Sequence, residues 1–492
     1  MTSNQATQNK YPETHQRIGI FLGPLLFIFF MLLDGNQILM SQAAWRTAGV
    51  ALWMAAWWAT EAVPVPVTAF LPLITFNPLD ITTFKEAAAP YSHPTIYLFL
   101  GAFILAIAIE RWDLHKRIAL AILTRVGTNG KRLVGGFMAV AALLSMWMTN
   151  TSTTMMLMPI AVSVATVILA NHSDLSLKQQ ENFQVALLLG LAFAATIGGL
   201  ATLVGTPPNA LLAAYLSNTH NIEIGFAEWM LVGVPVSMIM LPIAWFVLTN
   251  WAFSVEIEET AAAKQYLEKL RAELGDISVA EVRVGITFLL VATLWILRRP
   301  LNEMFHISSL NDSGIVMAAA LMLFLLPSGN AQQRTLLVWD DLQRLPWGVL
   351  ILFGGGLSLA AGVSSSGLAE WLGSNLSPLI AFGVIALIIS STALVIFLTE
   401  LTSNLATTAT FLPVVGAIAL QADVPLLTLC VPITLAASCA FMLPVATPPN
   451  AIVFASGKIS IPQMVKAGVY LNCLGMLLLA VVGVWWAPLI LS

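Results

Sequence analysis

The chain alternates between long apolar runs and short polar connections. A helix that crosses the ~30 Å hydrocarbon core of a bilayer needs about 20 residues, because each residue adds ~1.5 Å. Runs of about this length recur along the whole chain and predict a polytopic helical membrane protein. They cover residues 18–33, 45–63, 65–79, 94–110, 133–148 with 155–170, 183–204, 229–250, 284–297, 313–327, 347–363, 377–399 with 409–420, 425–443 and 468–490.

Composition agrees with this pattern. Hydrophobic residues make up 58% of the 492 residues and charged residues only 9%, whereas about a quarter of the residues are charged in a soluble protein. The three cysteines, Cys430, Cys439 and Cys473, lie in apolar stretches without metal-ligand spacing. They are expected to pack in the core rather than to form a disulfide framework.

Two of the apolar runs are broken by polar residues at their centres. The first run has no Asp, Glu, Lys or Arg from Leu133 to Ser173, yet residues 149–154 read TNTSTT. The second run carries SNLATT at 403–408, followed by a return arm from Ala409 to Leu420. That arm of 12 residues would be about 18 Å long. Because this is too short to cross, the second broken run is predicted to be a re-entrant helical hairpin with a polar tip, over 377–420. The first return arm, Met155 to Ala170, has 16 residues, so its length alone does not decide; the repeat described next predicts the same form for it, over 133–170.

The two broken runs are copies of one pattern. Asn150, Thr153, Thr154 and Pro159 return 254 residues later as Asn404, Thr407, Thr408 and Pro413, and the GTPPNA of 205–210 returns as ATPPNA at 446–451. In each half, therefore, a polar tip is followed by a helix that Thr-Pro-Pro-Asn interrupts. A polar segment rich in Ala, Glu and Lys, 254–283, is predicted to connect the halves on the cytoplasmic side.

Basic residues orient the chain. If each hairpin enters and leaves on one side, 11 full spans remain and the termini lie on opposite faces. With the N-terminus in the cytoplasm, only Arg46, Lys85, Arg298 and Arg299 of the 21 basic residues lie outside, and 17 lie inside. The hairpins then enter from opposite faces, which predicts two inverted repeats, an architecture in which transporters bind their substrate near the midplane.

The tips carry chemistry suited to ions. Where one helix ends, free carbonyl oxygens suit Na⁺, and where the next begins, free N–H groups and the positive end of the dipole suit an anion. The proline pair removes N–H groups and frees further carbonyls. The apolar spans offer no convincing Lys or Arg to pair with an anion. Bound cations would therefore have to offset the charge of an anion, which predicts cation-coupled anion binding.

The paired tips, the paired Thr-Pro-Pro-Asn breaks and TEAVPVPVTAFLP at 60–72 resemble the divalent anion–sodium symporter family, known as INDY-type, which includes sodium-coupled dicarboxylate, citrate and sulfate transporters. The likeness spans about residues 18–490. It implies a homodimer with a fixed scaffold domain and a mobile transport domain that works as an elevator. The expected segments are a cytoplasmic N-terminus 1–17, scaffold 18–128, transport domain 129–253, connector 254–283, scaffold 284–375 and transport domain 376–492.

The resemblance also implies site residues. Transferred from the family's motifs to the matching positions of this chain, one sodium site would comprise Ser145, Thr149, Asn150 and Gly205. The second sodium site would comprise Thr399, Thr402, Asn404 and Ala446. The substrate would meet Asn150, Thr151, Thr206, Pro207, Ser403, Asn404, Leu405, Thr447 and Pro448. The first tip has Thr149 where the family pattern has Ser, which keeps the hydroxyl. Leu405 departs further, because it lacks the hydroxyl expected opposite the substrate and so leaves the identity of the substrate open.

Glu400 has no acidic counterpart in the first half, where Met146 stands. A carboxylate at membrane depth is a candidate functional group. Two interpretations remain open: a supporting role or solvation in a polar cleft, and a ligand for a proton or Na⁺.

The sequence thus predicts an all-α membrane protein that carries out sodium-coupled symport of a small divalent anion, most simply a C4-dicarboxylate such as succinate, malate or fumarate. A sodium/sulfate symporter and a sodium-independent dicarboxylate exchanger are the alternatives. An ion channel would show a charged or carbonyl ring, and an enzyme would need a nucleophile with its base or metal ligands; neither pattern is present. We expect Na⁺ as the only cofactor and no nucleic-acid partner. The expected location is a bacterial inner membrane, with the N-terminus cytoplasmic and the C-terminus extracytoplasmic.

Overall fold

The structure is a computed structural model that describes residues 14–33, 40–172, 175–259, 261–306, 310–376 and 383–491. The predicted N-terminal segment up to residue 13 and the start of the second predicted hairpin, 377–382, lie outside these ranges.

The elements of the described part of the first half are all helices. Its helices are α1 Thr14–Leu32, α2 Gln42–Thr60, α3 Val65–Thr68, α4 Leu71–Thr75, α5 Phe84–Ala88, α6 Pro94–Arg111, α7 Leu114–Val126, α8 Gly130–Ser145, α9 Asn150–Ala170, α10 Leu177–Gly199, α11 Pro207–His220, α12 Phe226–Phe246 and α13 Ala261–Glu273. Short 3₁₀ and π turns extend α5 and α12 at Ala89–Ser92 and Val247–Ala252. The predicted connector is thus helical over α13.

The second half repeats this helical character with one exception. Its elements are α14 Val279–Phe305, α15 Asp312–Leu325, β1 Pro327–Asn330, β2 Gln333–Thr335, α16 Trp347–Ser365, α17 Leu368–Leu376, α18 Val384–Thr399, α19 Asn404–Gln421, α20 Leu426–Ala437, α21 Pro448–Phe454, α22 Ile461–Val481 and α23 Ala487–Leu491. A 3₁₀ turn at Trp339–Arg344 precedes α16, and a π turn at Val482–Trp486 follows α22. The strands pair antiparallel as a small hairpin that the sequence analysis did not predict.

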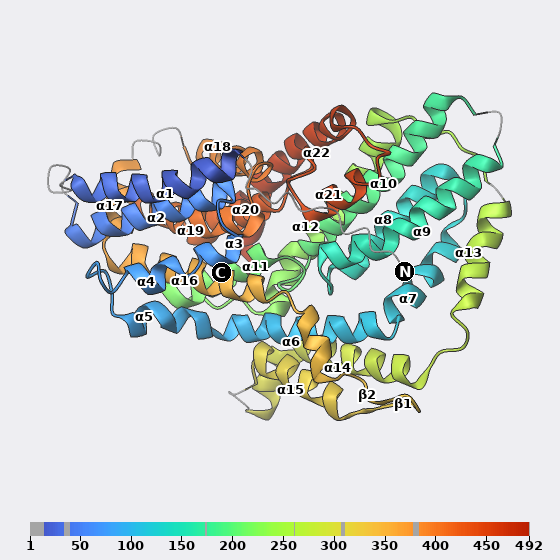
Figure 1. Ribbon diagram of the computed structural model, residues 1–492, viewed down its shortest axis with the longest axis horizontal. Coiled ribbons are helices and arrows are strands. Elements are labelled where there is room, and N and C mark those ends of the chain that lie inside the picture. The colour runs from blue at the N-terminus through green and yellow to red at the C-terminus, as the bar shows by residue number, and fades with distance from the viewer. Residues whose placement is uncertain are drawn as a thin grey trace.

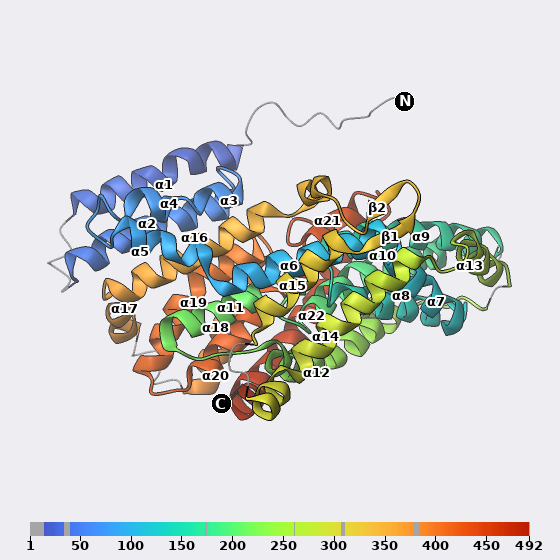
Figure 2. The same ribbon diagram turned by 90° about the horizontal axis from the view of Figure 1, so that it is seen from below.

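The molecule is elongated, with helices of different segments at its two ends. Figure 1 shows α1, α2 and α17 at one end and α7, α9 and α13 at the other, with α6 running lengthwise between the two ends and α14 and α15 packed beside it. The view from below shows the same separation, with α1 and α2 forming an outer layer (Figure 2). α1 packs against α2, and α6 against α15. The two predicted hairpins, α8–α9 and α18–α19, lie toward different ends of the molecule (Figure 1).

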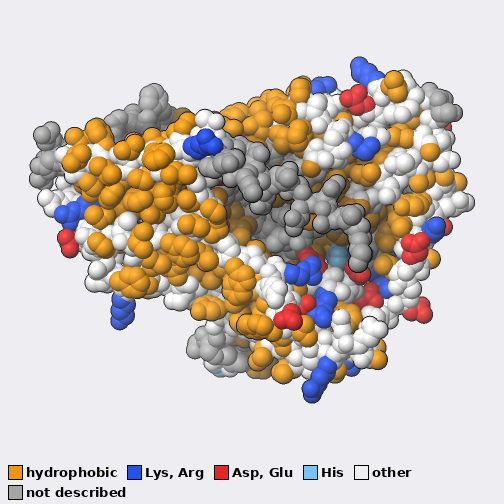
Figure 3. Space-filling view, in the orientation of Figure 1, with side chains coloured by type: hydrophobic (Ala, Val, Ile, Leu, Met, Phe, Trp, Pro, Cys, Tyr) orange, Lys and Arg blue, Asp and Glu red, His pale blue; other side chains and the backbone are white. Residues whose placement is uncertain are grey.

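The surface separates apolar from charged side chains. On the face in Figure 3, hydrophobic side chains dominate the part formed by α1, α2 and their neighbours, whereas most charged side chains gather toward α13 and α14. Phe21, Leu25 and Leu32 of α1 are 68%, 60% and 80% exposed. Apolar side chains of this size gain from contact with lipid tails, so this helix suits a bilayer.

Nine helices in the described ranges are long and apolar enough to cross a membrane, against the 11 full spans predicted. Four shorter apolar helices accompany them, at Val65–Thr75, Asp312–Leu325, Val384–Thr399 and Leu426–Ala437. Three of the shorter helices stand where full spans were predicted, at 65–79, 313–327 and 425–443, and two of the nine long helices, α9 and α19, are return arms of the predicted hairpins.

The hairpins have longer return arms than the sequence suggested. α19 begins at Asn404 and has 18 residues, because the polar residues 404–408 are helical rather than part of an extended tip. α9 likewise begins at Asn150 and has 21 residues. The length argument from a 12-residue arm is therefore wrong, and both arms are among the nine helices that could cross. The helix–break–helix form at 146–149 and 400–403 is confirmed.

The two halves interlock around their broken helices. α11, which follows the first break, packs against α19 and α20 of the second half. α21, which follows the second break, packs against α9 and α10 of the first half. Phe193 of α10 and Phe441 of the second break also meet edge to face, with ring centroids 5.1 Å apart. Each half therefore supports the polar break of the other.

The three cysteines were expected to pack in the core. Cys430 and Cys439 are buried as predicted, but Cys473 is exposed. Its expected place in the core is wrong, because the apolar surface around it faces outward on α22 rather than inward.

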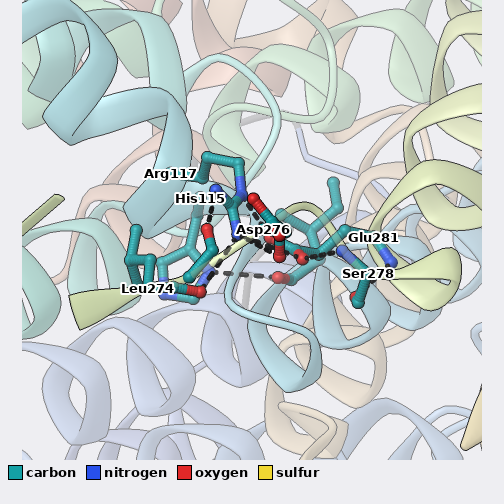
Figure 4. Close-up of polar contacts among 8 residues, drawn as sticks. His115, Arg117, Leu274, Asp276, Ser278 and Glu281 are labelled. Carbon is teal, nitrogen blue, oxygen red and sulfur yellow. Dashed lines mark hydrogen bonds and ion pairs between the residues drawn. The ribbon is translucent and has the colours of Figure 1, made fainter. Parts of the chain in front are cut away.

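The joint between the halves contains a half-buried arginine contact (Figure 4). Arg117 of α7 donates through Nε to Glu281 Oε1 at 2.6 Å and through Nη1 to Gly275 O at 3.0 Å. Its Nη2 reaches Leu274 O and Asp276 O at 3.3 and 3.2 Å. One guanidinium thus satisfies the carbonyl groups left free where α13 ends and pairs with the first turn of α14.

Candidate functional site

The first tip connects the end of α8 to the start of α9. Ser145, the last residue of α8, donates its hydroxyl hydrogen to Asn150 Oδ1. Thr149 caps α9, because its Oγ1 accepts from Ser152 N at 3.1 Å. Asn150 is thereby fixed at the start of a helix with its amide oxygen directed to Ser145.

The first break separates α10 from α11. α10 ends at Gly199, and α11 begins at Pro207, where a missing N–H costs nothing. The side chain of Asn209 spans the break: Nδ2 donates to Gly199 O at 3.2 Å, Leu200 O at 3.2 Å and Thr202 O at 2.8 Å. This amide replaces backbone partners that the unwound carbonyls have lost, as a buried polar segment requires.

The first tip and the first break come together. Thr202 Oγ1 donates to Met146 O at 2.5 Å and accepts from Gly205 N at 3.0 Å. A Cβ placed on Gly199 would lie 2.7 Å from Asn150 Oδ1 and 3.0 Å from Gly205 O. Two oxygen atoms of the predicted first sodium site, Asn150 Oδ1 and Gly205 O, therefore lie beside Gly199, and the hydroxyl of Ser145 bonds to the first of them. The hydroxyl of Thr149, the fourth predicted ligand, serves instead as the helix cap.

Gly199 is itself a feature that sequence reasoning missed. The available signal was the Gly-Gly pair that ends the helix before the first break, six residues ahead of Gly205.

The second tip has the same plan with different groups. Thr399 Oγ1 lies 2.9 Å from Asn404 Oδ1 and 2.8 Å from Ala437 O. Thr402 turns to Thr407, with 2.7 Å between their hydroxyls, and donates to Leu398 O at 3.0 Å. Thr399 and Asn404 thus lie together, as predicted for the second sodium site.

The second break runs from the end of α20 at Ala437 to the start of α21 at Pro448. Asn450 holds it as Asn209 holds the first break, donating to Ala440 O at 3.2 Å and Leu443 O at 3.1 Å. Ala446 lies within this break and is 5% exposed. The matching asparagines support the common plan inferred from the two Thr-Pro-Pro-Asn motifs.

Glu400 connects the second tip to the second break. Its two carboxylate oxygens accept from the backbone N–H groups of Phe441, Met442 and Leu443 at 2.8–3.0 Å. Oε1 also accepts from Asn472 Nδ2 at 2.7 Å. The side chain is buried, with 3% of the residue exposed. Because N–H donors surround both oxygens, this geometry favours the supporting role over that of an ion ligand.

Aromatic contacts anchor the first tip. Trp147 lies against Phe226 of α12, with ring centroids 5.8 Å apart, and meets Phe288 of α14 edge-on at 4.9 Å. Trp229 of α12 donates to Leu200 O in the first break at 3.1 Å. One helix, α12, therefore holds both the tip and the break of the first half.

The residues predicted to meet the substrate differ in burial. Asn150, Thr151, Ser403, Asn404 and Pro207 are half-buried and Pro448 is exposed, whereas Leu405, Thr206 and Thr447 are buried. Thr447 caps α21 through Asn450 N at 3.3 Å. The hydroxyls of Ser403 and Thr206 make no such cap. The predicted substrate residues therefore include buried and accessible members, and Leu405, at 5% exposure, is among the most enclosed.

A cavity of about 370 Å³ lies elsewhere, between the α4–α5 region and α16. Its lining includes Phe76, Glu86 and Ser358 and none of the predicted site residues. It is therefore separate from the two tips.

The chain matches known proteins along almost its whole length. The model of the sodium:sulfate symporter transmembrane region matches residues 16–492. The chain belongs to this family. It is 40% identical over 490 residues to a protein of Staphylococcus saprophyticus named sodium-dependent dicarboxylate transporter SdcS, covering 99% of this chain and 94% of the relative. A protein of the same name from Staphylococcus aureus strain MRSA252 is 39% identical over 499 residues, covering 100% and 95%.

Membership confirms the resemblance inferred from the tips and breaks. With the nine apolar helices it establishes a polytopic integral membrane protein of a transporter family.

Proposed function

We propose that the protein is a sodium-coupled symporter of a C4-dicarboxylate. The observation that carries this proposal is the pair of matched sites, in which an asparagine at a tip faces a hydroxyl and a broken helix: Asn150 with Ser145, and Asn404 with Thr399. The names of two relatives at about 40% identity give the substrate class and the coupling ion.

Amide, hydroxyl and backbone carbonyl oxygens are hard ligands that suit Na⁺. Ser145, Asn150 and Gly205 would hold one ion, and Thr399, Asn404 and Ala446 a second, with Thr149 and Thr402 shaping the tips. The bound cations would offset the charge of the anion, whose carboxylates would meet Asn150, Thr151, Ser403 and Asn404. Pro207 and Pro448 would border this space, and Thr206 and Thr447 would start the helices behind it.

Movement would follow the predicted domains. Segments 129–253 and 376–492 would carry the two sites across the membrane along the scaffold of 18–128 and 284–375, within a homodimer. The N-terminus would be cytoplasmic and the C-terminus extracytoplasmic, in a bacterial inner membrane. This inverted arrangement rests on the repeated sequence and on the distribution of Lys and Arg.

The test is uptake of radiolabelled succinate into proteoliposomes with an inward gradient of Na⁺ or of K⁺. We expect uptake with Na⁺ only. Asn150→Ala and Asn404→Ala should each abolish it, while Asn171→Ala, an exposed asparagine at the end of α9, should leave it intact. Equal uptake with K⁺ would contradict sodium coupling.

Two further measurements separate the alternatives. Uptake that needs internal succinate but no Na⁺ would indicate an exchanger, and sulfate that competes better than succinate would indicate a sulfate symporter.

The topology is tested with single cysteines, in a background without Cys430, Cys439 and Cys473. Cysteines at positions 132 and 175 should react from the inside, and those at 375 and 423 from the outside. Reaction from opposite sides within one pair would refute re-entrant hairpins.

A further inference from the structure

The absence of a side chain on Gly199 shapes the first site. A Cβ on this residue would lie 2.7 Å from Asn150 Oδ1 and 3.2 Å from Asn150 Nδ2, with Gly205 O at 3.0 Å. Carbon atoms do not approach oxygen or nitrogen so closely without a shift. The oxygens of Asn150 and Gly205 can therefore converge only because residue 199 ends at its Cα.

Hydrogen bonds hold the backbone on both sides of this contact. The carbonyl of Gly199 accepts from Asn209 Nδ2 at 3.2 Å, which fixes the backbone. Across the break, a Cβ on Gly205 would lie 2.5 Å from Gly199 O. Gly205 N is in turn held by Thr202 Oγ1 at 3.0 Å. The backbones of Gly199 and Gly205 thus face each other across the break, and hydrogen bonds hold both of them in place.

The second half has the same loop with larger residues. The positions 241 residues after Gly199 and Gly205 are Ala440 and Ala446. Ala440 O accepts from Asn450 Nδ2 at 3.2 Å, matching the bond from Asn209 to Gly199 O. Ala440 is fully buried. The second loop therefore accommodates two methyl groups that the first excludes.

We propose that Gly199 is a specificity-determining residue, which makes the first cation site the narrower and the stricter toward cation size. This inference rests on the proposed sodium coupling and assigns size discrimination to one of its two sites. Selectivity among similar cations depends on cavity size, ligand number and ligand flexibility. A methyl on residue 199 would push the amide of Asn150 away from Gly205 O and open that group of ligands.

The experiment compares Gly199→Ala with Ala440→Gly, the reciprocal change at the matching position. Succinate uptake is measured in proteoliposomes against Na⁺ and Li⁺ concentration, and thermal unfolding of the purified protein is measured with and without Na⁺ in the absence of succinate. For Gly199→Ala we expect at least a tenfold rise in half-saturating Na⁺, a changed ratio of Li⁺ to Na⁺ activation and a smaller Na⁺-induced rise in Tm. For Ala440→Gly we expect less than a threefold change and an unchanged ratio.

The outcomes separate this inference from the proposed function. Wild-type uptake that ignores Na⁺ would remove the proposed function and this inference with it. Na⁺-dependent wild-type uptake with equal shifts in both variants, or with no shift in Gly199→Ala, would overturn only the role of Gly199. Unfolding without Na⁺ shows whether Gly199→Ala folds. If it does not, Ala440→Gly decides alone, because it removes atoms and cannot clash, and a changed Li⁺ to Na⁺ ratio there would overturn the inference.

Discussion

The two broken helices perform the same task by different means. In the first, a neutral hydroxyl on Thr202 links the break to the carbonyl of Met146 in the tip. In the second, the carboxylate of Glu400 in the tip accepts from three successive N–H groups of the break. In both halves the donor lies in the break and the acceptor in the tip, but the first half supplies the side chain from the break and the second supplies it from the tip.

This difference follows from which backbone groups each break leaves free. Unwound backbone within the membrane must find partners inside the protein. In the first break, free carbonyls meet the donors of Asn209 and Trp229. In the second break, three N–H groups turn toward the tip and require an acceptor. A repeated architecture can therefore keep its asparagines and prolines while the groups that fix its loops diverge.

The largest expected effect comes from Glu400→Gln. An amide NH₂ would face the N–H groups of Met442 or Leu443, and each buried donor left without a partner costs ~1–3 kcal/mol. With the hydrogen bonds to the charge also weakened, we expect a loss of about 3–5 kcal/mol. Thermal unfolding in detergent should show a drop in Tm of several degrees, together with loss of succinate uptake.

The matched control is Glu370→Gln, which removes an equal charge from an exposed position on α17. An unchanged Tm in Glu400→Gln would mean that the carboxylate does not hold the second break and that the two halves are not fixed by different means.

A smaller effect is expected from Thr202→Val. The change removes the bond to Met146 O and leaves Gly205 N without its acceptor, at a cost of ~1–3 kcal/mol. Because Gly205 then loses its fixed position, half-saturating Na⁺ should rise several-fold, and Thr202→Ser should restore it. Thr166→Val, where the hydroxyl bonds only within α9, serves as the control. Failure of Thr202→Ser to restore Na⁺ activation would assign the effect to packing instead.

The smallest effect is expected from Leu405→Thr. Leu405 matches Thr151 of the first half and is 5% exposed, so an added hydroxyl would meet few partners. We expect a shift of less than about 1.4 kcal/mol, or tenfold, in the relative inhibition by succinate, malate and sulfate, with the Na⁺ requirement unchanged. Competition assays measure this ranking. An identical ranking would place Leu405 away from the substrate.

The sequence predicted those features of this site that follow from residue type alone. Proline must break a helix, and the repeated asparagines located both tips, so these features could be read directly. The length of α19 could not, because Asn404 and the threonines after it are poor helix formers whose helical state depends on tertiary packing. The partners of Glu400 could not be predicted either. They are backbone N–H groups of a loop about 40 residues away, and nearly every residue type carries such a group, so the sequence does not distinguish them. The role of Gly199 depends on a contact distance across two segments, which only the fold defines.

The contact of Arg117 with Glu281 has a consequence for how the chain is made. The two residues are separated by 164 positions. At a synthesis rate of ~5–20 residues per second, roughly 8–30 seconds pass between their appearance at the ribosome. During that time α7 is present without the pairing that fixes it, while the first tip and first break already exist. The first half must therefore be inserted and held by its own contacts, and the arginine completes the joint only once the second half has begun to emerge.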